Sequence, residues 1–261
     1  MGRQIPGSLS DWIHGAWSRA GDSILTWKQR LQIALDVAEG LEYLHHSTTP
    51  SYVHKDLKSS NILLDKNFRA KIANFGLAKS GGIGGSQVHA VTSHIVGTHG
   101  YMAPEFIRDG LVTPKLDVFA FGVIVLEILS GKQAVDVGSN IGGLGGGERV
   151  LLSEEIRFLI ESENPRENVR DWVHPQIKGE REVETGFTVA MLAKICVERD
   201  LTLRPSVREV RVQLSRLAGG GGGGEGTGEA GGGNYCSYSS QESIDRNKHS
   251  TVSNSSEFQA R

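Results

Sequence analysis

One stretch of the sequence, residues 113–132, limits the possible folds more than any other. It reads TPKLDVFAFGVIVLEILSGK and is apolar on nearly every side of a predicted helix. A helix that is apolar all round has to be surrounded by protein or by lipid. Its apolar run, VFAFGVIVLEIL, is shorter than the roughly 20 residues that span a bilayer, and it contains Glu127. We therefore predict a buried core helix, with Thr113 as N-cap, Pro114 in the first turn and Gly131 at the end.

The composition is that of an ordinary globular protein. Hydrophobic residues make up 38% of the 261-residue chain and charged residues 22%, and the formal net charge is −2. This balance gives no reason to expect a nucleic-acid partner. The first residues, MGRQIPGSLS, lack the apolar core of a signal peptide. We therefore expect a soluble cytosolic chain with reduced cysteines and without a membrane segment.

The sequence divides into a body, residues 1–217, and a tail, residues 218–261. The tail begins AGGGGGGEGTGEAGGG and continues as a stretch rich in Ser and Asn. Its apolar surface is too small to offset the conformational entropy of the chain, so we predict that the tail is disordered.

Helical patterns dominate the body. Apolar residues recur at helical spacing in residues 26–46, 182–200 and 206–218, and Thr26 is placed to cap the first of these helices. Three short segments, SYVH, NILLD and AKIAN, have the character of strands, with a turn at residues 65–67 between the last two. The sequence therefore predicts an α+β body that is mainly helical and has one small β-hairpin region.

The first residues that could take part in catalysis lie in HKDLKSSN, which contains Asp56, Lys58 and Asn61. This spacing suits phosphoryl transfer to a hydroxyl group. The Asp would take or orient the hydroxyl proton, the Lys would offset charge on the γ-phosphate, and the Asn oxygen would bind Mg²⁺. By itself, the loop is equally consistent with an ordinary polar turn.

Three further elements favour the phosphoryl-transfer interpretation. The tripeptide NFG starts 13 residues after Asn61, GTHGYMAPE follows at residues 97–105, and the predicted core helix carries Asp117. With these elements in order, the chain resembles the C-terminal lobe of a eukaryotic protein kinase of the plant receptor-like type. The segments HKDLKSSNILLDKNFRAKIANFGLAKS, HIVGTHGYMAPEFI and LVTPKLDVFAFGVIVLEILSGK are similar to LysM-type receptor-like kinases, which act as co-receptors in chitin perception.

The resemblance implies a protein-kinase-like fold over the body and a role for each matching residue. Asp56, Lys58 and Thr98 would form the catalytic group, and Asn61 and Asn74 would occupy the positions that bind ATP and Mg²⁺ in the family. Supporting roles fall to His54 in the loop, to Phe75 and Gly76 in the turn, to Asp117 beneath the loop, and to an ion pair between Glu105 and Arg204.

Three departures from the family pattern bear on activity. Asn74 replaces the Asp that binds Mg²⁺, and a neutral amide is a weaker ligand for a hard cation. Lys55 replaces the Arg that precedes the catalytic Asp in many kinases, so control by phosphorylation of Thr92 or Ser93 should be weaker. We also find no Gly-rich loop, no Val-Ala-x-Lys strand and no helix Glu to pair with that Lys. The N-lobe is therefore expected to be absent, with the domain truncated at the hinge.

These features leave three interpretations open. The chain is a pseudokinase that relays a glycan signal through a partner receptor-like kinase, or an active Ser/Thr kinase that uses ATP and Mg²⁺ on protein substrates with an N-lobe missing from this sequence, or an inert truncated fragment. We rank them in that order. The resemblance also implies a place on the cytoplasmic face of the plasma membrane.

Overall fold

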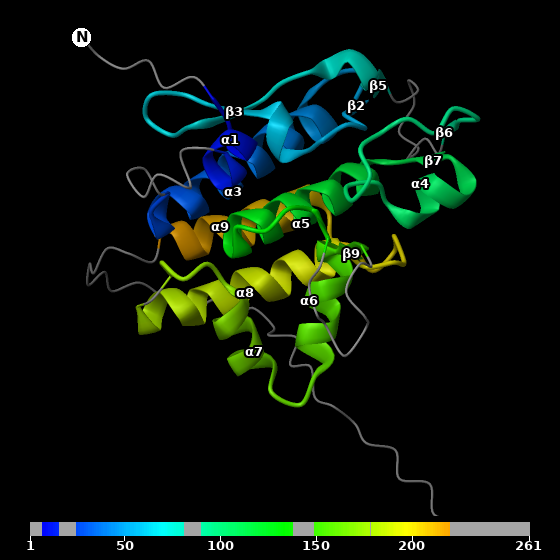
Figure 1. Cartoon of the computed structure of the whole chain (residues 1–261). Helices are drawn as coiled ribbons and strands as arrows, with labels where there is room; N and C mark the ends of the chain where they lie inside the picture. Colours follow the sequence, from blue (N-terminus) through cyan, green and yellow to red (C-terminus); the bar gives the residue numbers. More distant parts are fainter. Residues whose placement is uncertain (1–6, 16–24, 81–89, 138–148, 178, 220–261) are drawn as a thin grey trace, which may run out of the picture. The chain divides into compact units, whose positions relative to one another are not determined.

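A computed structural model of the chain describes residues 7–15, 25–80, 90–137, 149–177 and 179–219 (Figure 1). The predicted disordered tail lies outside these residues, except for Ala218 and Gly219, which end the last helix. The folded part has both helices and strands, in agreement with the predicted α+β class.

Helix α5, Pro114–Ser130, forms the centre of the core. Every residue from Leu116 to Ser130 is buried, as its uninterrupted apolar pattern predicts. The caps are also those predicted. The Thr113 side chain accepts the backbone N–H of Lys115, and Gly131 adopts a left-handed conformation with a φ of 75°. Within the described residues, no helix is both long enough and apolar enough to cross a membrane.

Two of the other long helices of the described residues pack against this core helix, and a third packs mainly on one of these two. Helix α3 (Trp27–Glu42) contacts both α5 and α9 (Val207–Gly219), and α8 (Glu180–Cys196) packs along α5, below it in Figure 1. Gly122 lets α5 and α8 approach closely, because a Cβ atom at this position would lie 2.7 Å from the Cβ of Cys196. The same burial raises the pKa of the Cys196 thiol to about 12, so this thiol is unreactive at neutral pH.

The bounds of two predicted helices need correction. The helix predicted over residues 26–46 begins after its Thr26 cap as expected, but α3 ends at Glu42 and a π-helical turn follows at Tyr43–Ser47. The helix predicted over residues 182–200 begins two residues earlier and ends at Cys196. Its start is set by the Glu182 carboxylate, which accepts the N–H of Gly179.

Four short helices of the described residues were not predicted: α1 (Leu9–His14), α4 (Pro104–Asp109), α6 (Leu152–Glu161) and α7 (Pro165–Trp172). With six to ten residues each, they contain too few turns for a clear apolar period. Helix α1 is instead fixed by a capping box, in which Ser8 and Asp11 satisfy each other's backbone N–H groups.

The strands form more than the single hairpin region predicted. In the described part of the chain, β1 (Gly7–Ser8), β3 (Ile62–Leu64) and β4 (Ala70–Ile72) make a three-stranded antiparallel sheet, and the predicted hairpin is its β3–β4 part. Three two-stranded sheets pair β2 (Tyr52–Val53) with β5 (Lys79–Ser80), β6 (Ala90–Val91) with β7 (Leu111–Val112), and β8 (Val135–Val137) with β9 (Arg149–Leu151). Ladders of two or three residues are too short to leave an alternating pattern in the sequence.

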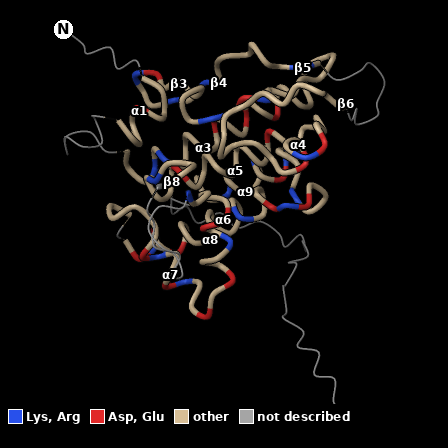
Figure 2. The backbone as a smooth tube through the Cα atoms, turned by 45° about the vertical axis from the view of Figure 1, so that its right-hand side comes forward, with Lys and Arg blue, Asp and Glu red and all other residues tan. Residues whose placement is uncertain are grey.

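Charges of both signs are interspersed along the described backbone (Figure 2). Because opposite charges lie close together, their fields largely cancel at a distance, and the field at a site is set mainly by its immediate neighbours.

Candidate phosphoryl-transfer site

The loop that holds Asp56 is fixed from below by Asp117, in the first turn of α5. The Asp117 carboxylate is 1% exposed and accepts the N–H of His54 at 2.8 Å and the N–H of Lys55 at 3.0 Å. These bonds hold Lys55 at a φ of 70°, a left-handed conformation that few side chains adopt without support. The structure thus places Asp117 where the resemblance implied, beneath the backbone of the loop.

His45 is a third partner of Asp117 that the sequence analysis did not single out. Its Nε2 lies 2.8 Å from Oδ2 of Asp117, and both side chains are almost fully buried. A signal was present, because His45 follows Leu41 by four residues and so continues the buried stripe of the preceding helix.

His54 connects the loop to the Asn-Phe-Gly turn. Its Nε2 donates to the carbonyl oxygen of Ala73 at 3.0 Å, and its Nδ1 accepts the N–H of Asp56 at 3.3 Å. The ring of Phe75 meets the imidazole edge-on, with the centroids 5.0 Å apart. With both ring nitrogens engaged and the residue fully buried, His54 packs and orients the loop and is not available as a base.

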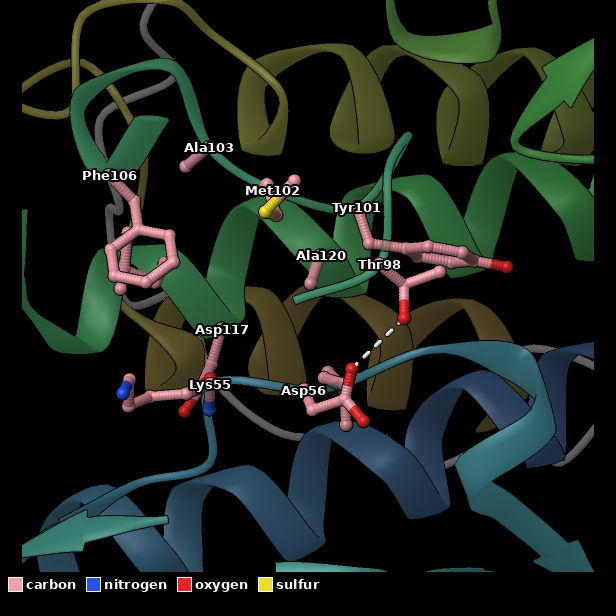
Figure 3. A pocket seen from close by; sticks show the side chains of 11 residues that line it. Lys55, Asp56, Thr98, Tyr101, Met102, Ala103, Phe106, Asp117 and Ala120 are labelled. Carbon is pink, nitrogen blue, oxygen red and sulfur yellow. Dashed lines mark hydrogen bonds between the residues drawn. The ribbon is translucent and has the colours of Figure 1, made fainter. Parts of the chain in front are cut away.

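Asp56, Lys58 and Thr98 form one polar cluster. The Thr98 hydroxyl donates to Oδ1 of Asp56 at 3.1 Å, as Figure 3 shows. The Lys58 ammonium group donates to the Thr98 hydroxyl at 2.8 Å and lies 3.2 Å from Oδ2 of Asp56. The cluster therefore combines a carboxylate that can accept a hydroxyl proton with a cation that can stabilise a phosphate.

Asn61 and Asn74 are brought together beside this cluster. The Asn61 amide nitrogen donates to the main-chain oxygen of Asp56 at 2.7 Å and to its Oδ2 at 3.0 Å. These two acceptors fix the orientation of the amide, so Oδ1 of Asn61 faces the turn. There it accepts a hydrogen bond from Nδ2 of Asn74 at 3.3 Å.

Asn74 itself has a φ of 63° and a ψ of 67°. Asn and Asp are among the few residues other than Gly that adopt this left-handed conformation readily. The backbone of the turn therefore accepts Asn where the resemblance expects Asp. Phe75 and Gly76 follow in a short 3₁₀ turn, Phe75–Leu77.

The side chains present at this turn fit Mg²⁺ poorly. Two facing oxygens, as an Asp and an Asn would offer, are well placed to share a cation, whereas here the amide N–H of Asn74 faces the Asn61 oxygen and donates to it. Mg²⁺ also prefers carboxylate oxygens. Among the residues that the structure describes, no group of three or more His, Cys, Asp and Glu side chains is placed to hold a metal.

The ion pair implied between Glu105 and Arg204 is present and buried. Two guanidinium nitrogens each donate to one carboxylate oxygen at 2.7 Å, and the two side chains are 4% and 0% exposed. The guanidinium also lies over the ring of Phe119, at 5.0 Å from its centroid. This contact joins α4, at the end of GTHGYMAPE, to the segment before α9.

Lys55 lines the same pocket as Asp56 and Thr98, and its ammonium group lies over the ring of Phe106, 5.7 Å from the centroid. Burial lowers the pKa of Lys55, the nearby charge of Lys79 lowers it further, and Asp117 opposes both effects. Thr92 is half-buried and its N–H donates to the carbonyl oxygen of Gly110 at 2.9 Å, whereas Ser93 is exposed. Phosphorylation of either residue stays a prediction.

The chain was compared with known protein families and with known proteins. The protein kinase domain family matches residues 6–213. The chain belongs to the protein kinase domain family. It is 48% identical over 211 residues to Protein LYK5 of Arabidopsis thaliana, covering 81% of this chain and 31% of that protein. It is 45% identical over 203 residues to LysM domain receptor-like kinase 10 of Oryza sativa subsp. japonica, covering 76% and 32%.

A third relative is Chitin elicitor receptor kinase 1 of Arabidopsis thaliana, 40% identical over 211 residues, covering 81% of this chain and 32% of that protein. The chain thus spans roughly a third of the length of these relatives. The relatives of this kinase domain are therefore plant LysM receptor-like kinases. Membership of the protein kinase family implies the use of ATP and Mg²⁺. The roles of the individual site residues remain predictions.

Proposed function

We propose that this kinase domain is a signalling module with impaired phosphoryl transfer, a pseudokinase. The observation that carries the proposal is the hydrogen bond from Asn74 to Asn61, 3.3 Å long. It occupies the amide oxygen that would bind Mg²⁺, and it does so with a residue that brings no negative charge. Without a metal anchor, charge that develops on the phosphates in the transition state loses its main stabilisation.

The proposed setting is the cytoplasmic side of a plant LysM-type receptor-like kinase at the plasma membrane. It is supported by the 45% identity to a relative named LysM domain receptor-like kinase 10 and the 40% identity to one named Chitin elicitor receptor kinase 1. In this setting the module relays a glycan signal by binding a partner receptor-like kinase. We further propose that residues 1–217 correspond to the C-terminal lobe of a kinase, since the sequence contains no Gly-rich phosphate loop.

Metal binding tests the proposal directly. The change Asn74→Asp restores a carboxylate opposite Asn61, so this variant should bind Mn²⁺, used as a Mg²⁺ probe, at least about tenfold more tightly, as expected for a charged ligand that replaces a neutral one. The matched control is Asn67→Asp, which adds the same charge in an exposed turn. Binding is measured by water-proton relaxation. Equal Mn²⁺ affinity in the original chain and in Asn74→Asp would show that residue 74 is not the defect.

A second candidate function is an active Ser/Thr kinase. It is favoured by the Asp56–Lys58–Thr98 cluster, whose contacts of 2.8 to 3.2 Å suit transfer to a hydroxyl group. Incubation with labelled ATP and a generic protein substrate separates the two candidates. Our proposal expects no transfer above that of Asp56→Asn, and transfer that Asp56→Asn abolishes would favour the active kinase. A chain that neither transfers phosphate nor binds any partner would fit the inert fragment.

A further inference from the structure

A groove in the described structure lies in a part of the fold that the phosphoryl-transfer site does not use. It has a volume of about 680 Å³, and its lining comes from three helix ends: the start of α3, the start of α8 and the end of α9. These three ends lie together on the left of Figure 1. Pockets for small molecules typically have volumes of roughly 300–1,000 Å³ and often lie between helices. The groove therefore has the size and the position of a ligand site.

The side chains that line the inner part of the groove are apolar. Leu31 is buried, and Trp27 and Leu217 are partly buried against the core. A Cβ atom at Gly186 would lie 3.9 Å from the indole ring of Trp27, so this ring lies close to α8. A hydrocarbon group that covers such a surface removes apolar area from water, which is favourable. The lining therefore favours a ligand with a hydrocarbon part.

The rim of the groove carries positive charge. Three exposed cations, Lys28, Arg181 and Arg216, belong to its lining, and Glu182 is the one carboxylate among these lining residues. The Glu182 carboxylate already accepts the N–H of Gly179 at 2.9 Å. In the described part of the chain, neither Lys28 nor Arg216 has an ion-pair partner. An anionic group bound at this rim would therefore meet cations that are not yet paired.

The lining offers little to a polar ligand apart from these charges. Thr185 supplies the one side-chain hydroxyl of the lining, and this hydroxyl donates to the carbonyl oxygen of Arg181 at 2.8 Å. A sugar or a nucleotide has many polar groups, which are costly to remove from water unless the protein replaces their hydrogen bonds. The groove therefore suits a molecule that is apolar along most of its length and negatively charged at one end.

We propose that this groove binds a single-chain carboxylate of the fatty-acid class. Its hydrocarbon chain covers Trp27, Leu31 and Leu217, and its carboxylate lies at the rim, near Lys28 and Arg216. The lining shares no residue with the Asp56 cluster or with the Asn-Phe-Gly turn. The inference goes beyond the proposed function and does not depend on it, because it gives the kinase domain a second ligand site, formed by α3, α8 and α9.

The test measures binding of dodecanoate to the full chain by isothermal titration calorimetry, below the critical micelle concentration. Dodecanoate should bind at least about tenfold more tightly than octanoate, because its four additional methylene groups cover more of the apolar lining. Lys28→Gln combined with Arg216→Gln should weaken dodecanoate binding about fivefold, the effect of two exposed ion pairs. The matched control combines Lys66→Gln with Arg170→Gln, two exposed cations outside the groove, and should bind like the original chain.

Two further variants locate the bound molecule. Thr185→Phe places a ring in the groove and should weaken dodecanoate binding by more than tenfold. Its matched control is Thr188→Phe, at an exposed position of the same helix outside the groove, where the hydroxyl also donates to the carbonyl oxygen four residues earlier. If Thr185→Phe fails to fold, Trp27→Phe keeps the test decisive. Dodecanoate should change the tryptophan fluorescence of the original chain, and most of this change should be lost in Trp27→Phe.

Several outcomes would overturn the inference. They are equal affinity for octanoate and dodecanoate, equal losses in Thr185→Phe and Thr188→Phe, and a fluorescence change that Trp27→Phe leaves intact. Binding to phosphatidylserine vesicles without binding to monomeric dodecanoate would also overturn it, because the cations would then serve a membrane surface. None of these measurements needs metal or nucleotide, so the inference can fail while the impaired-transfer proposal stands, and the reverse also holds.

Discussion

The two sides of the loop that holds Asp56 are held by different kinds of contact. Below the loop, the Asp117 carboxylate receives three donors within 3.0 Å, and nearby the Arg204–Glu105 pair is closed by two bonds of 2.7 Å. Beside the loop, Asn61 and Asn74 face each other through one amide bond of 3.3 Å. The first side is charged, buried and fully paired, whereas the second side is neutral.

This difference separates what the fold needs from what phosphoryl transfer needs. Removal of Asp117 or Arg204 would leave buried donors or a buried charge unpaired, which is costly in any protein. Replacement of Asp by Asn at position 74 leaves the backbone in an accessible conformation and gives the amide a partner. The kinase scaffold can therefore accept Asn at position 74, which is consistent with the function that we propose.

The largest expected effect comes from the charged side. Arg204→Met keeps most of the side-chain volume but leaves the Glu105 carboxylate buried without its cation. We expect the free energy of unfolding to fall by about 3–5 kcal/mol, measured by urea denaturation. The control is Arg108→Met, which breaks the ion pair with Asp109 at side chains that are 76% and 47% exposed. Equal losses in the two variants would mean that burial does not distinguish the two pairs.

A smaller loss is expected at the anchor of the loop. Asp117→Asn keeps the shape of the side chain. Its amide nitrogen, however, is itself a donor, and it replaces an oxygen that accepted a hydrogen bond. Since no unpaired charge remains, we expect a loss of about 1–3 kcal/mol, smaller than that of Arg204→Met. The measurement is the same urea titration, with the exposed Asp109→Asn as control. If Asp117→Asn were more destabilising than Arg204→Met, the Asp117 anchor would contribute more to stability than the Arg204–Glu105 ion pair.

The sequence predicted best what depends on long patterns. Seventeen residues of α5 carry a continuous apolar signal with Thr113 and Gly131 at its ends, and the structure has this helix with these caps. The sheets beyond the β3–β4 hairpin were missed, because pairings such as Tyr52–Val53 with Lys79–Ser80 join residues far apart in the sequence and involve only two residues on each strand.

The candidate site was predicted unevenly for a related reason. Asp56, Lys58 and Asn61 lie in one short motif, and the structure brings them into contact with Thr98 and Asn74. Their roles stay predictions. Residues that only the tertiary fold brings into contact leave no motif in the sequence. His14 meets Glu127 across 113 residues, and His45 meets Asp117 across 72. In the sequence, Glu127 counted only as evidence against a membrane span, and its contacts became visible once α1 and α5 were in place.

The smallest expected effect lies at the exposed start of α9. Glu209 accepts the N–H and the hydroxyl of Ser206 at 2.7 and 2.8 Å, and these bonds lower its pKa below the ordinary 4.5. A lowered pKa in the folded state means that the contribution to stability is complete above pH 4.5 and is lost as the pH falls through the lowered value. At neutral pH, Glu209→Gln should therefore cost about 0.5 kcal/mol, since solvent screens the site.

The cost of Glu209→Gln should vanish in acid, which a series of urea titrations from neutral to acidic pH would detect. Ser206→Ala removes the hydroxyl donor and keeps the backbone N–H donor, so it should reproduce part of the loss. The double variant should cost less than the sum of the two single changes, because both act on one interaction. Losses that simply add, or a cost of Glu209→Gln that persists in acid, would show that the carboxylate stabilises α9 through some other contact. In contrast to Arg204→Met, this exposed charge should change how the stability depends on pH and leave the kinase scaffold folded.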